Sequence, residues 1–169
     1  MTSEGAPVDG YDASQSEMMQ ELCILVNEED DIIGSGTKLS VHRGDGARHR
    51  AFSVLIYDSE GRLLVQKRSS DKITFPNVWA NSCCSHPLDI DGERDNGQGA
   101  ENAARRKLNQ ELGIPEEVSS NWDFSHIGKM EYSARWDSEW VEREIDHILV
   151  VMSDAVINHN ENEISEVLW

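Results

Sequence analysis

The stretch 81–87 reads Asn-Ser-Cys-Cys-Ser-His-Pro and places thiols beside an imidazole. A thiol such as that of Cys84 can transfer protons, and His86, two residues further on, can bind a metal ion. Arg68 and Lys72 precede this stretch and could hold an anionic substrate. The same pattern also fits a small apolar cysteine packed in a core, with His86 capping a turn. The chemical interpretation therefore depends on ligands and charges elsewhere in the chain.

Three histidines and two glutamates are the candidate metal ligands. His42, His49 and His86 each lie in or beside a segment that is predicted to be a loop. Glu142 and Glu144 are two residues apart, so in a strand both carboxylates point to one face. Together the five side chains could form an octahedral site for Mn, Mg or Zn. The alternative interpretation is a set of idle surface histidines and an acidic strand edge.

Four basic residues could bind a diphosphate: Lys38, Arg68, Lys72 and Lys107. The formal net charge is −17, which disfavours nucleic acid and an anionic membrane as partners. A small diphosphate is equally disfavoured unless several of the 15 lysines and arginines gather at its site. The fork of an arginine grips diphosphate oxygens, and lysine adds a point charge. Ordinary solvated side chains are the alternative interpretation.

The length of 169 residues fits one domain with a real core. Residues 1–17 are predicted to form a disordered tail, because Gly, Ser, Asp and Glu dominate them, and residues 18–169 are the predicted domain. The start lacks a secretory signal, and no apolar run approaches the roughly 20 residues that span a bilayer. Three cysteines, two of them adjacent, make no disulfide framework, so a reducing cytoplasm is the expected location.

Local patterns predict more strands than helices. Strands are predicted at 21–26, from Ile32 onward, and at 51–57, 62–68, 122–132 and 144–152. The Asp-Ser-Glu-Gly turn at 58–61 makes the third and fourth of these strands the clearest hairpin. The glycine-broken segment 39–50 and the acidic segment 89–99 are predicted to be loops.

The best helix signal spans residues 100–112. Apolar residues recur there at helical spacing, and Gly113 supplies the C-cap. With one long helix among several strands, the predicted class is α+β, with a mixed β-sheet packed by helices.

The end of this helix resembles a degenerate Nudix box. The usual box reads Arg-Glu-apolar-x-Glu-Glu-x-Gly-apolar, whereas residues 106–114 read Arg-Lys-Leu-Asn-Gln-Glu-Leu-Gly-Ile. Lys107 and Gln110 replace two acids, which leaves only Glu111 of the metal-binding glutamate pair. Cleavage of a diphosphate needs several metal-bound carboxylates, so this departure disfavours a hydrolase.

The chain resembles the type 1 isopentenyl-diphosphate delta-isomerases, a non-hydrolytic branch of the Nudix fold. The resemblance covers about residues 22–169, and its most specific motif is the Trp-x-Asn-Ser-Cys-Cys-Ser-His-Pro run that ends at Pro87. The other matching stretches are residues 49–53, 66–69, 75–78 and 111–113. The single residues His42, Lys72 and Tyr132 and the pattern Glu142-x-Glu144 also match.

The resemblance implies a role for each motif residue. One divalent metal would be held by His42, His49, His86, Glu142 and Glu144. Glu111 would help to bind a Mg²⁺ that bridges to the substrate diphosphate. That diphosphate would be contacted by Lys38, Arg68, Lys72 and Lys107. Cys84 would be the catalytic thiol, and Glu144 with Tyr132 would lie across the substrate from it.

The implied reaction moves the double bond of isopentenyl diphosphate to give dimethylallyl diphosphate. It adds a proton at one end of the alkene and removes one from the neighbouring carbon, through a tertiary carbocation that water would destroy. The site must therefore place an acid and a base across a dry pocket. We expect Glu144 to deliver the proton, Cys84 to receive one as a thiolate favoured by a nearby cation, and Trp79 to stabilise positive charge.

Two further functions stay open at this stage. A Nudix diphosphate hydrolase would release inorganic phosphate or a nucleotide monophosphate. A non-catalytic module would bind a prenyl diphosphate or a metal without turnover. Family members usually continue beyond the segment 161–169 into helices that help to close the pocket, and this part is not found in the sequence. The expected partner is a small prenyl diphosphate, and the expected state is a monomer or a weak homo-oligomer.

Overall fold

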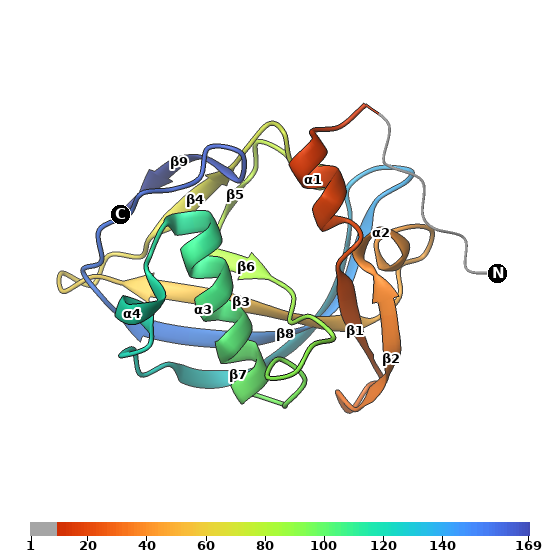
Figure 1. The fold of residues 1–169 in the computed structure, drawn as a ribbon, viewed down its shortest axis with the longest axis horizontal. Helices are drawn as coiled ribbons and strands as arrows, with labels where there is room; N and C mark the ends of the chain where they lie inside the picture. The colour runs from red at the N-terminus through yellow and green to blue at the C-terminus, as the bar shows by residue number, and fades with distance from the viewer. Residues whose placement is uncertain (1–9) are drawn as a thin grey trace.

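The computed structural model describes residues 10–169, which fold into two β-sheets and four helices (Figure 1). The larger sheet contains β1 (Leu22–Val26), β2 (Ile32–Thr37), β3 (His49–Tyr57), β6 (Cys83–Ser85), β7 (Ser125–Arg135) and β8 (Val141–Met152). The smaller sheet contains β4 (Val65–Arg68), β5 (Trp79–Ala80) and β9 (Ile164–Leu168). The helices are α1 (Ala13–Met18), α2 (Lys38–Val41), α3 (Gln98–Leu112) and α4 (Glu116–Ser119).

The parallel pair β3–β8 is the centre of the larger sheet. The strand order is β2-β1-β3-β8-β7, and the short β6 pairs with β3 in addition. The β3–β8 ladder starts with His49 opposite Glu144, and the β3–β6 ladder places Ser53 opposite Cys84. Antiparallel and parallel pairs thus occur in one sheet, which confirms the predicted mixed sheet and the α+β class.

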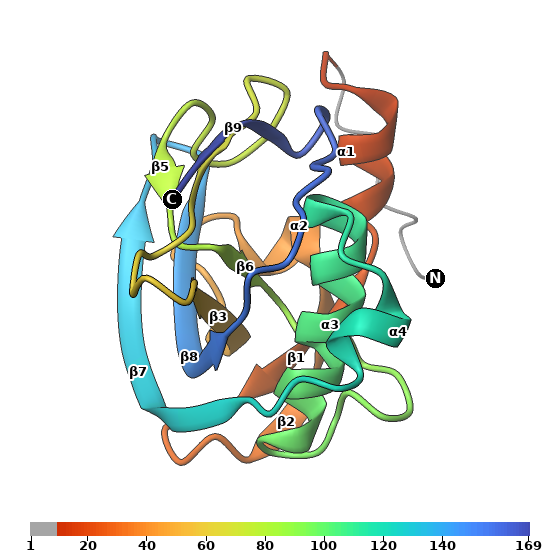
Figure 2. The same cartoon turned by 90° about the vertical axis from the view of Figure 1, so that its left-hand side faces the viewer.

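Helix α3 covers one face of the larger sheet (Figure 2). Its Ala103, Ala104 and Leu108 are fully buried in the main core, together with Phe52 of β3 and Leu149 of β8. The helix ends at Leu112, as the sequence predicts. Gly113 has φ 65°, and its N–H bonds to the carbonyl of Asn109, so the C-cap needs the left-handed conformation that glycine adopts most easily.

The predicted hairpin at 51–57 and 62–68 forms only at its turn. Tyr57 and Leu63 make an isolated bridge, but β4 then leaves for the smaller sheet, where it pairs with β5 and β9. Ser82 explains the separation, because its hydroxyl accepts from the N–H of Ile56 at 2.8 Å and donates to the carbonyl of Leu64 at 2.7 Å. A segment distant in sequence therefore takes the position that the returning strand was expected to fill.

The predicted disordered tail, residues 1–17, includes residues that form a helix in the structure. Residues 1–9 lie outside the described part, but α1 begins at Ala13 and overlaps the last five residues of the predicted tail. Asp12 caps α1 by accepting from the N–H groups of Ser14 and Gln15. Gln15 is buried against the segment 162–163, about 148 residues away, and this long-range contact has no local sequence signal.

Two other segments differ from their predictions. The segment 39–50 was predicted to be a loop, but it contains most of α2 and the start of β3. β9 was not predicted at all, and its pairing with β4 lies at the end of the molecule opposite β1 and β2 (Figures 1 and 2). Within residues 10–169, no helix is both long and apolar enough to cross a membrane.

Candidate active site

A pocket lies against the face of β3 and β8 that carries His49 and Glu144. It is lined by Lys38, Phe52, Ser53, Arg68, Lys72, Thr74, Cys84, Ser85, His86, Glu111, Tyr132, Glu142 and Glu144. Nine of these thirteen residues were predicted as site residues from the sequence. The lining that sequence reasoning missed is Phe52, Ser53, Thr74 and Ser85. Alternation along β3 offered a signal for Ser53, since it points to the same face as His49.

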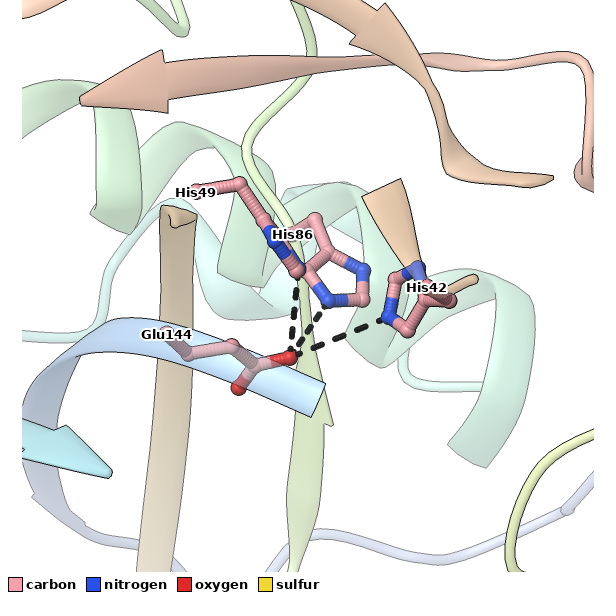
Figure 3. A group of neighbouring side chains, drawn as sticks. All are labelled: His42, His49, His86 and Glu144. Carbon is pink, nitrogen blue, oxygen red and sulfur yellow. Dashed lines mark hydrogen bonds and ion pairs between the residues drawn. The ribbon is translucent and has the colours of Figure 1, made fainter. Parts of the chain in front are cut away.

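Three histidines converge on one carboxylate, as the sequence predicts (Figure 3). His42 follows α2, His49 opens β3, His86 follows β6, and Glu144 lies on β8. One potential ligand atom from each of the four lies within 4.8 Å of the others. The Nε2 atoms of His42, His49 and His86 lie 4.0, 3.4 and 2.8 Å from Oε1 of Glu144.

Backbone contacts fix the orientation of two of the rings. Nδ1 of His42 lies 2.7 Å from the carbonyl of Lys38, and Nδ1 of His49 lies 2.7 Å from the carbonyl of Ala47. A carbonyl only accepts, so each Nδ1 carries the proton and each Nε2 presents a lone pair. Nε2 of His49 is buried without a hydrogen-bond partner among the described residues. Lone pairs that face a carboxylate repel it, and a cation between them removes this repulsion.

The protonation states also suit a metal ion. Burial lowers the pKa of His42 to about 2 and that of His86 to about 4, so these imidazoles are neutral near pH 7. Burial works against the charge of Glu144, but its close contact with His86 outweighs burial and holds the pKa of Glu144 well below the usual value. Neutral imidazoles and an ionised carboxylate are the forms that bind metal. The His42, His49, His86 and Glu144 group fits a divalent cation.

Glu142 lies beside this group. It lies on β8 two residues before Glu144, and both line the pocket, as expected from their spacing. The hydroxyl of Tyr132 lies 2.5 Å from Oε2 of Glu144 and 3.3 Å from Oε2 of Glu142. Burial and the charge of Glu144 raise the pKa of Glu142 to about 7 and raise that of Tyr132 above its usual value. Four of the five predicted ligands gather directly, and the fifth is linked to them through Tyr132.

The two cysteines of β6 have different surroundings. Alternation along the strand sends Cys83 into the main core and Cys84 to the pocket, which agrees with the choice of Cys84 from the sequence. Burial raises the pKa of the Cys84 thiol to about 12, and Arg68 offsets only part of this effect. Arg68 thus favours the thiolate, as expected of a nearby cation, but in the ligand-free protein burial is the larger effect and favours the thiol.

Three of the four predicted cations line the pocket. Arg68 is held by the carbonyls of Phe75 and Thr74, and Lys72 and Lys38 are the other two. Lys107 lies deeper, with Nζ 3.1 Å from Oε1 of Glu111. Glu111 itself lines the pocket, so Lys107 reaches the site only through this ion pair.

Trp79 does not have the position that its expected role needs. It lies on β5, is 43% exposed, and is not one of the described residues that line the pocket. The pocket therefore gives no support to cation stabilisation by this indole.

Asp146 is a third carboxylate on the pocket face of β8, and sequence reasoning missed it. It follows Glu144 by two residues and is buried. Ser53 donates to its Oδ2 at 2.7 Å, whereas Oδ1 has no partner within the described part of the chain. Burial raises the pKa of Asp146 to about 7. Asp146 continues the alternating pattern of Glu142 and Glu144, and this pattern could have predicted its place on the same face.

The fold and the pocket define a Nudix protein. The NUDIX domain family matches residues 47–169. The solved structure of DR0079 from Deinococcus radiodurans superposes with a TM-score of 0.65 at 23% identity, over 88% of this chain and 82% of that one.

More similar relatives define the branch. Isopentenyl-diphosphate Delta-isomerase I of Camptotheca acuminata is 42% identical over 168 residues, which cover 95% of this chain and 72% of the relative. Isopentenyl-diphosphate Delta-isomerase 1 of Bos taurus is 43% identical over 95% of this chain and 74% of its own length. A Gibberella zeae relative, isopentenyl-diphosphate delta-isomerase IDI1, is 39% identical over 99% of this chain and 70% of its own length. The chain belongs to the isopentenyl-diphosphate delta-isomerase family.

Proposed function

We propose that this protein converts isopentenyl diphosphate into dimethylallyl diphosphate by moving the carbon–carbon double bond. The observation that carries the proposal is that one pocket is lined by a thiol, by a tyrosine–carboxylate pair and by three cations. The thiol is that of Cys84, and the pair is Tyr132 with Glu144. These are the groups that an alkene isomerase needs for two proton transfers and for holding a diphosphate.

The proton-transfer step uses groups that this chain places in the pocket. One group protonates the terminal alkene carbon, and a second group takes a proton from the neighbouring carbon. In the ligand-free protein burial keeps Cys84 as the thiol, while Glu144 is ionised and accepts from Tyr132. We assign the two proton transfers to Cys84 on one side and to Glu144 with Tyr132 on the other. The two roles exchange in the opposite direction of the reaction.

A divalent ion at His42, His49, His86 and Glu144 is part of the proposal, with Glu142 as a fifth ligand. When bound, such an ion supplies positive charge that lowers the proton affinity of the groups attached to it. Its ligand set of nitrogen and oxygen suits Mn, Mg or Zn. A Mg²⁺ that accompanies the substrate diphosphate is assigned to Glu111.

The diphosphate is assigned to the basic side of the pocket. Lys38, Arg68 and Lys72 line it directly. Lys107 contributes through its ion pair with Glu111. These cations are the local exception that an acidic chain needs in order to hold a diphosphate.

The decisive experiment follows the alkene protons by NMR while the purified protein acts on isopentenyl diphosphate with Mg²⁺. We expect dimethylallyl diphosphate to form, and we expect Cys84→Ala to lower turnover about 1,000-fold, in the range of a lost acid–base group. Cys83→Ala is the matched control, because it removes the neighbouring thiol from the core and leaves the pocket intact. Full activity of Cys84→Ala would refute the mechanism. Release of inorganic phosphate would identify a hydrolase, and binding without turnover would identify a non-catalytic module.

Oligomeric state and location complete the proposal. A monomer or a weak homo-oligomer is proposed, because all groups assigned to the reaction come from one chain. A reducing compartment such as the cytoplasm is proposed, because Cys23, Cys83 and Cys84 are all free thiols. Size-exclusion chromatography with light scattering tests the first point, and imaging of the tagged protein in cells tests the second.

A further inference from the structure

Glu163 is a buried carboxylate that joins the pocket to the start of the described chain. Its side chain is only 2% exposed. Oε2 accepts from Nζ of Lys72 at 2.5 Å, and Oε1 accepts from Nε2 of Gln15 at 2.7 Å. One carboxylate therefore contacts a pocket lysine with one oxygen and α1 with the other.

The position of Glu163 is fixed by its backbone. Its carbonyl accepts from the N–H of Ser69 at 3.0 Å, and its own N–H donates to the carbonyl of Asn160 at 2.9 Å. Nε2 of Gln15 also lies 2.8 Å from Oδ1 of Asn162, the residue before Glu163. The carboxylate is held by the segment after β4 and by α1, so its direction toward Lys72 is set by the fold.

Lys72 needs such a partner because its ammonium is poorly solvated. Its side chain is 10% exposed, and burial lowers its pKa to about 8. The charged groups that face it are Glu163, Arg68 of β4, Glu111 of α3 and Lys38 of α2. Arg68 and Lys38 disfavour the ammonium, whereas Glu163 is the largest favourable influence and Glu111 a smaller one. A lysine without its charge cannot attract a diphosphate.

We propose that Glu163 is a positioning residue for diphosphate binding, which holds the Lys72 ammonium at the pocket wall and is itself held by Gln15 of α1. This inference rests on the proposed function in one respect, since the anion is taken to be the diphosphate of the substrate. Glu163 does not line the pocket, so it acts through Lys72. Docking of α1 and the strength of diphosphate binding are then coupled through a single carboxylate.

The first test measures the binding of inorganic pyrophosphate with Mg²⁺ by calorimetry at pH 7.5 and pH 6.0. Glu163→Gln keeps the shape of the side chain and removes its charge. At pH 7.5 we expect this variant to bind pyrophosphate roughly tenfold more weakly than the wild type, which corresponds to a fall in the pKa of Lys72 from about 8 to about 6.4. At pH 6.0 Lys72 regains its proton in the variant, and the two affinities should differ by less than about threefold. Comparison at equal pH cancels the titration of pyrophosphate itself.

Asp58→Asn is the matched control. Asp58 is a shielded carboxylate that pairs with Arg62 at the turn after β3, outside the pocket lining. This variant loses a similar ion pair, and its pyrophosphate affinity should equal that of the wild type at both pH values. A second variant, Gln15→Leu, leaves the charge of Glu163 in place and removes its anchor, and we expect about threefold weaker binding at pH 7.5.

The outcomes separate the inference from the proposed function. Equal affinities of wild type and Glu163→Gln at pH 7.5 would overturn the inference, and so would a loss that is the same at both pH values, since general damage to the pocket does not depend on the charge of Lys72. If Glu163→Gln does not fold, unchanged binding by Gln15→Leu overturns it. Pyrophosphate binding with the expected pH pattern but without isomerisation by the wild type would uphold the inference and reject the proposed function.

Discussion

The two faces of the β3–β8 pair each carry a buried polar cluster, and neighbouring residues build both. His49 and Glu144 lie on the face that carries the pocket, whereas Arg50 and His147 lie on the opposite face, because successive side chains of a strand alternate. On that opposite face, Arg50 and His147 surround Asp30, which lies in the turn between β1 and β2.

The carboxylate at the centre of the Asp30 cluster is matched by donors. Oδ1 of Asp30 accepts from Nε of Arg50 at 2.8 Å. Oδ2 lies 2.7 Å from Nζ of Lys129 and 2.8 Å from Nε2 of His147. Burial works against the carboxylate, but these three partners hold the pKa of Asp30 below its usual value. The carboxylate of Asp30 meets three donor groups and needs no additional ion, although Nδ1 of His147 has no partner among the described residues.

The pocket cluster, which consists of His42, His49, His86 and Glu144, places acceptors opposite an acceptor. The Nε2 lone pairs of His42 and His49 point toward Glu144 and find no donor there. Both clusters are buried and rich in charge, so burial alone does not separate a structural network from a functional site. The difference lies in what faces the central carboxylate, because Asp30 meets only donors whereas Glu144 faces the lone pairs of two imidazoles.

The largest expected effect comes from breaking the pocket cluster. His49→Asn should lower isomerase turnover about 100-fold or more, because it removes a ligand atom from the proposed metal site. In metal-free protein the free energy of unfolding should fall by no more than about 2 kcal/mol, since Nε2 of His49 makes no hydrogen bond and the amide of asparagine can replace the Nδ1 contact to the carbonyl of Ala47. NMR turnover and urea unfolding measure the two quantities.

His159→Asn is the matched control for this substitution. It makes the same chemical change on the connection between β8 and β9, away from the pocket, and it should leave turnover unchanged. Equal turnover of His49→Asn and wild type would contradict a role of the cluster in the reaction.

Breaking the Asp30 cluster should lower stability strongly and turnover only slightly. Asp30→Asn leaves Arg50 buried without its carboxylate and should lower the free energy of unfolding by about 3 kcal/mol. Turnover per folded molecule should stay within about threefold of the wild type, because the cluster lies behind the pocket. Urea unfolding followed by tryptophan fluorescence measures the first quantity. A stable but inactive variant would show that the two faces are not separate.

The contribution of Asp30 to the free energy of unfolding should depend on pH. The pKa of Asp30 is lower in the folded protein than in the unfolded chain, so its contribution is fully present above about pH 4 and is lost as pH falls toward the folded pKa. Between pH 5 and pH 3 the wild type should therefore lose about 1 kcal/mol more free energy of unfolding than Asp30→Asn. Parallel urea titrations at the two pH values check this difference, and equal losses would contradict the assignment.

The smallest effect is expected at Ser53. Ser53→Ala removes the hydroxyl that donates to Asp146 and should lower the free energy of unfolding by about 0.5 to 1 kcal/mol. This pair belongs to the pocket face but lies outside the proposed ligands, so the metal content of the protein should not change. Urea unfolding and elemental analysis of the same sample test both statements. Loss of metal from this variant would extend the cluster to Ser53.

The sequence predicted the parts of this molecule that depend on local pattern. The helix 100–112 follows from apolar spacing and Gly113, and the shared face of Glu142 and Glu144 follows from strand alternation. The specific Cys-Cys-Ser-His run indicated the family, and the resemblance to that family assigned the three histidines to one metal ion. The Trp79 role failed because it rested on chemistry alone, without any pattern that fixed the position of the indole.

The rest depends on contacts between distant segments. Asp30 lies in the turn between the first two predicted strands, yet its partners are 20, 99 and 117 residues away. Glu163 meets Gln15 across 148 residues, and Ser82 separates a hairpin that every local signal favoured. Local sequence does not show which segment occupies a strand edge, nor how deeply the thiol of Cys84 is buried.

Metal binding tests the central claim most directly. Calorimetric titration of chelator-treated protein with Mn²⁺ should show one strong site per chain in the wild type and in His159→Asn, and the site should be lost in His49→Asn. A wild type without such a site, or a His49→Asn variant that binds Mn²⁺ as strongly as the wild type, would contradict the assignment of the three imidazoles and Glu144 to a cation.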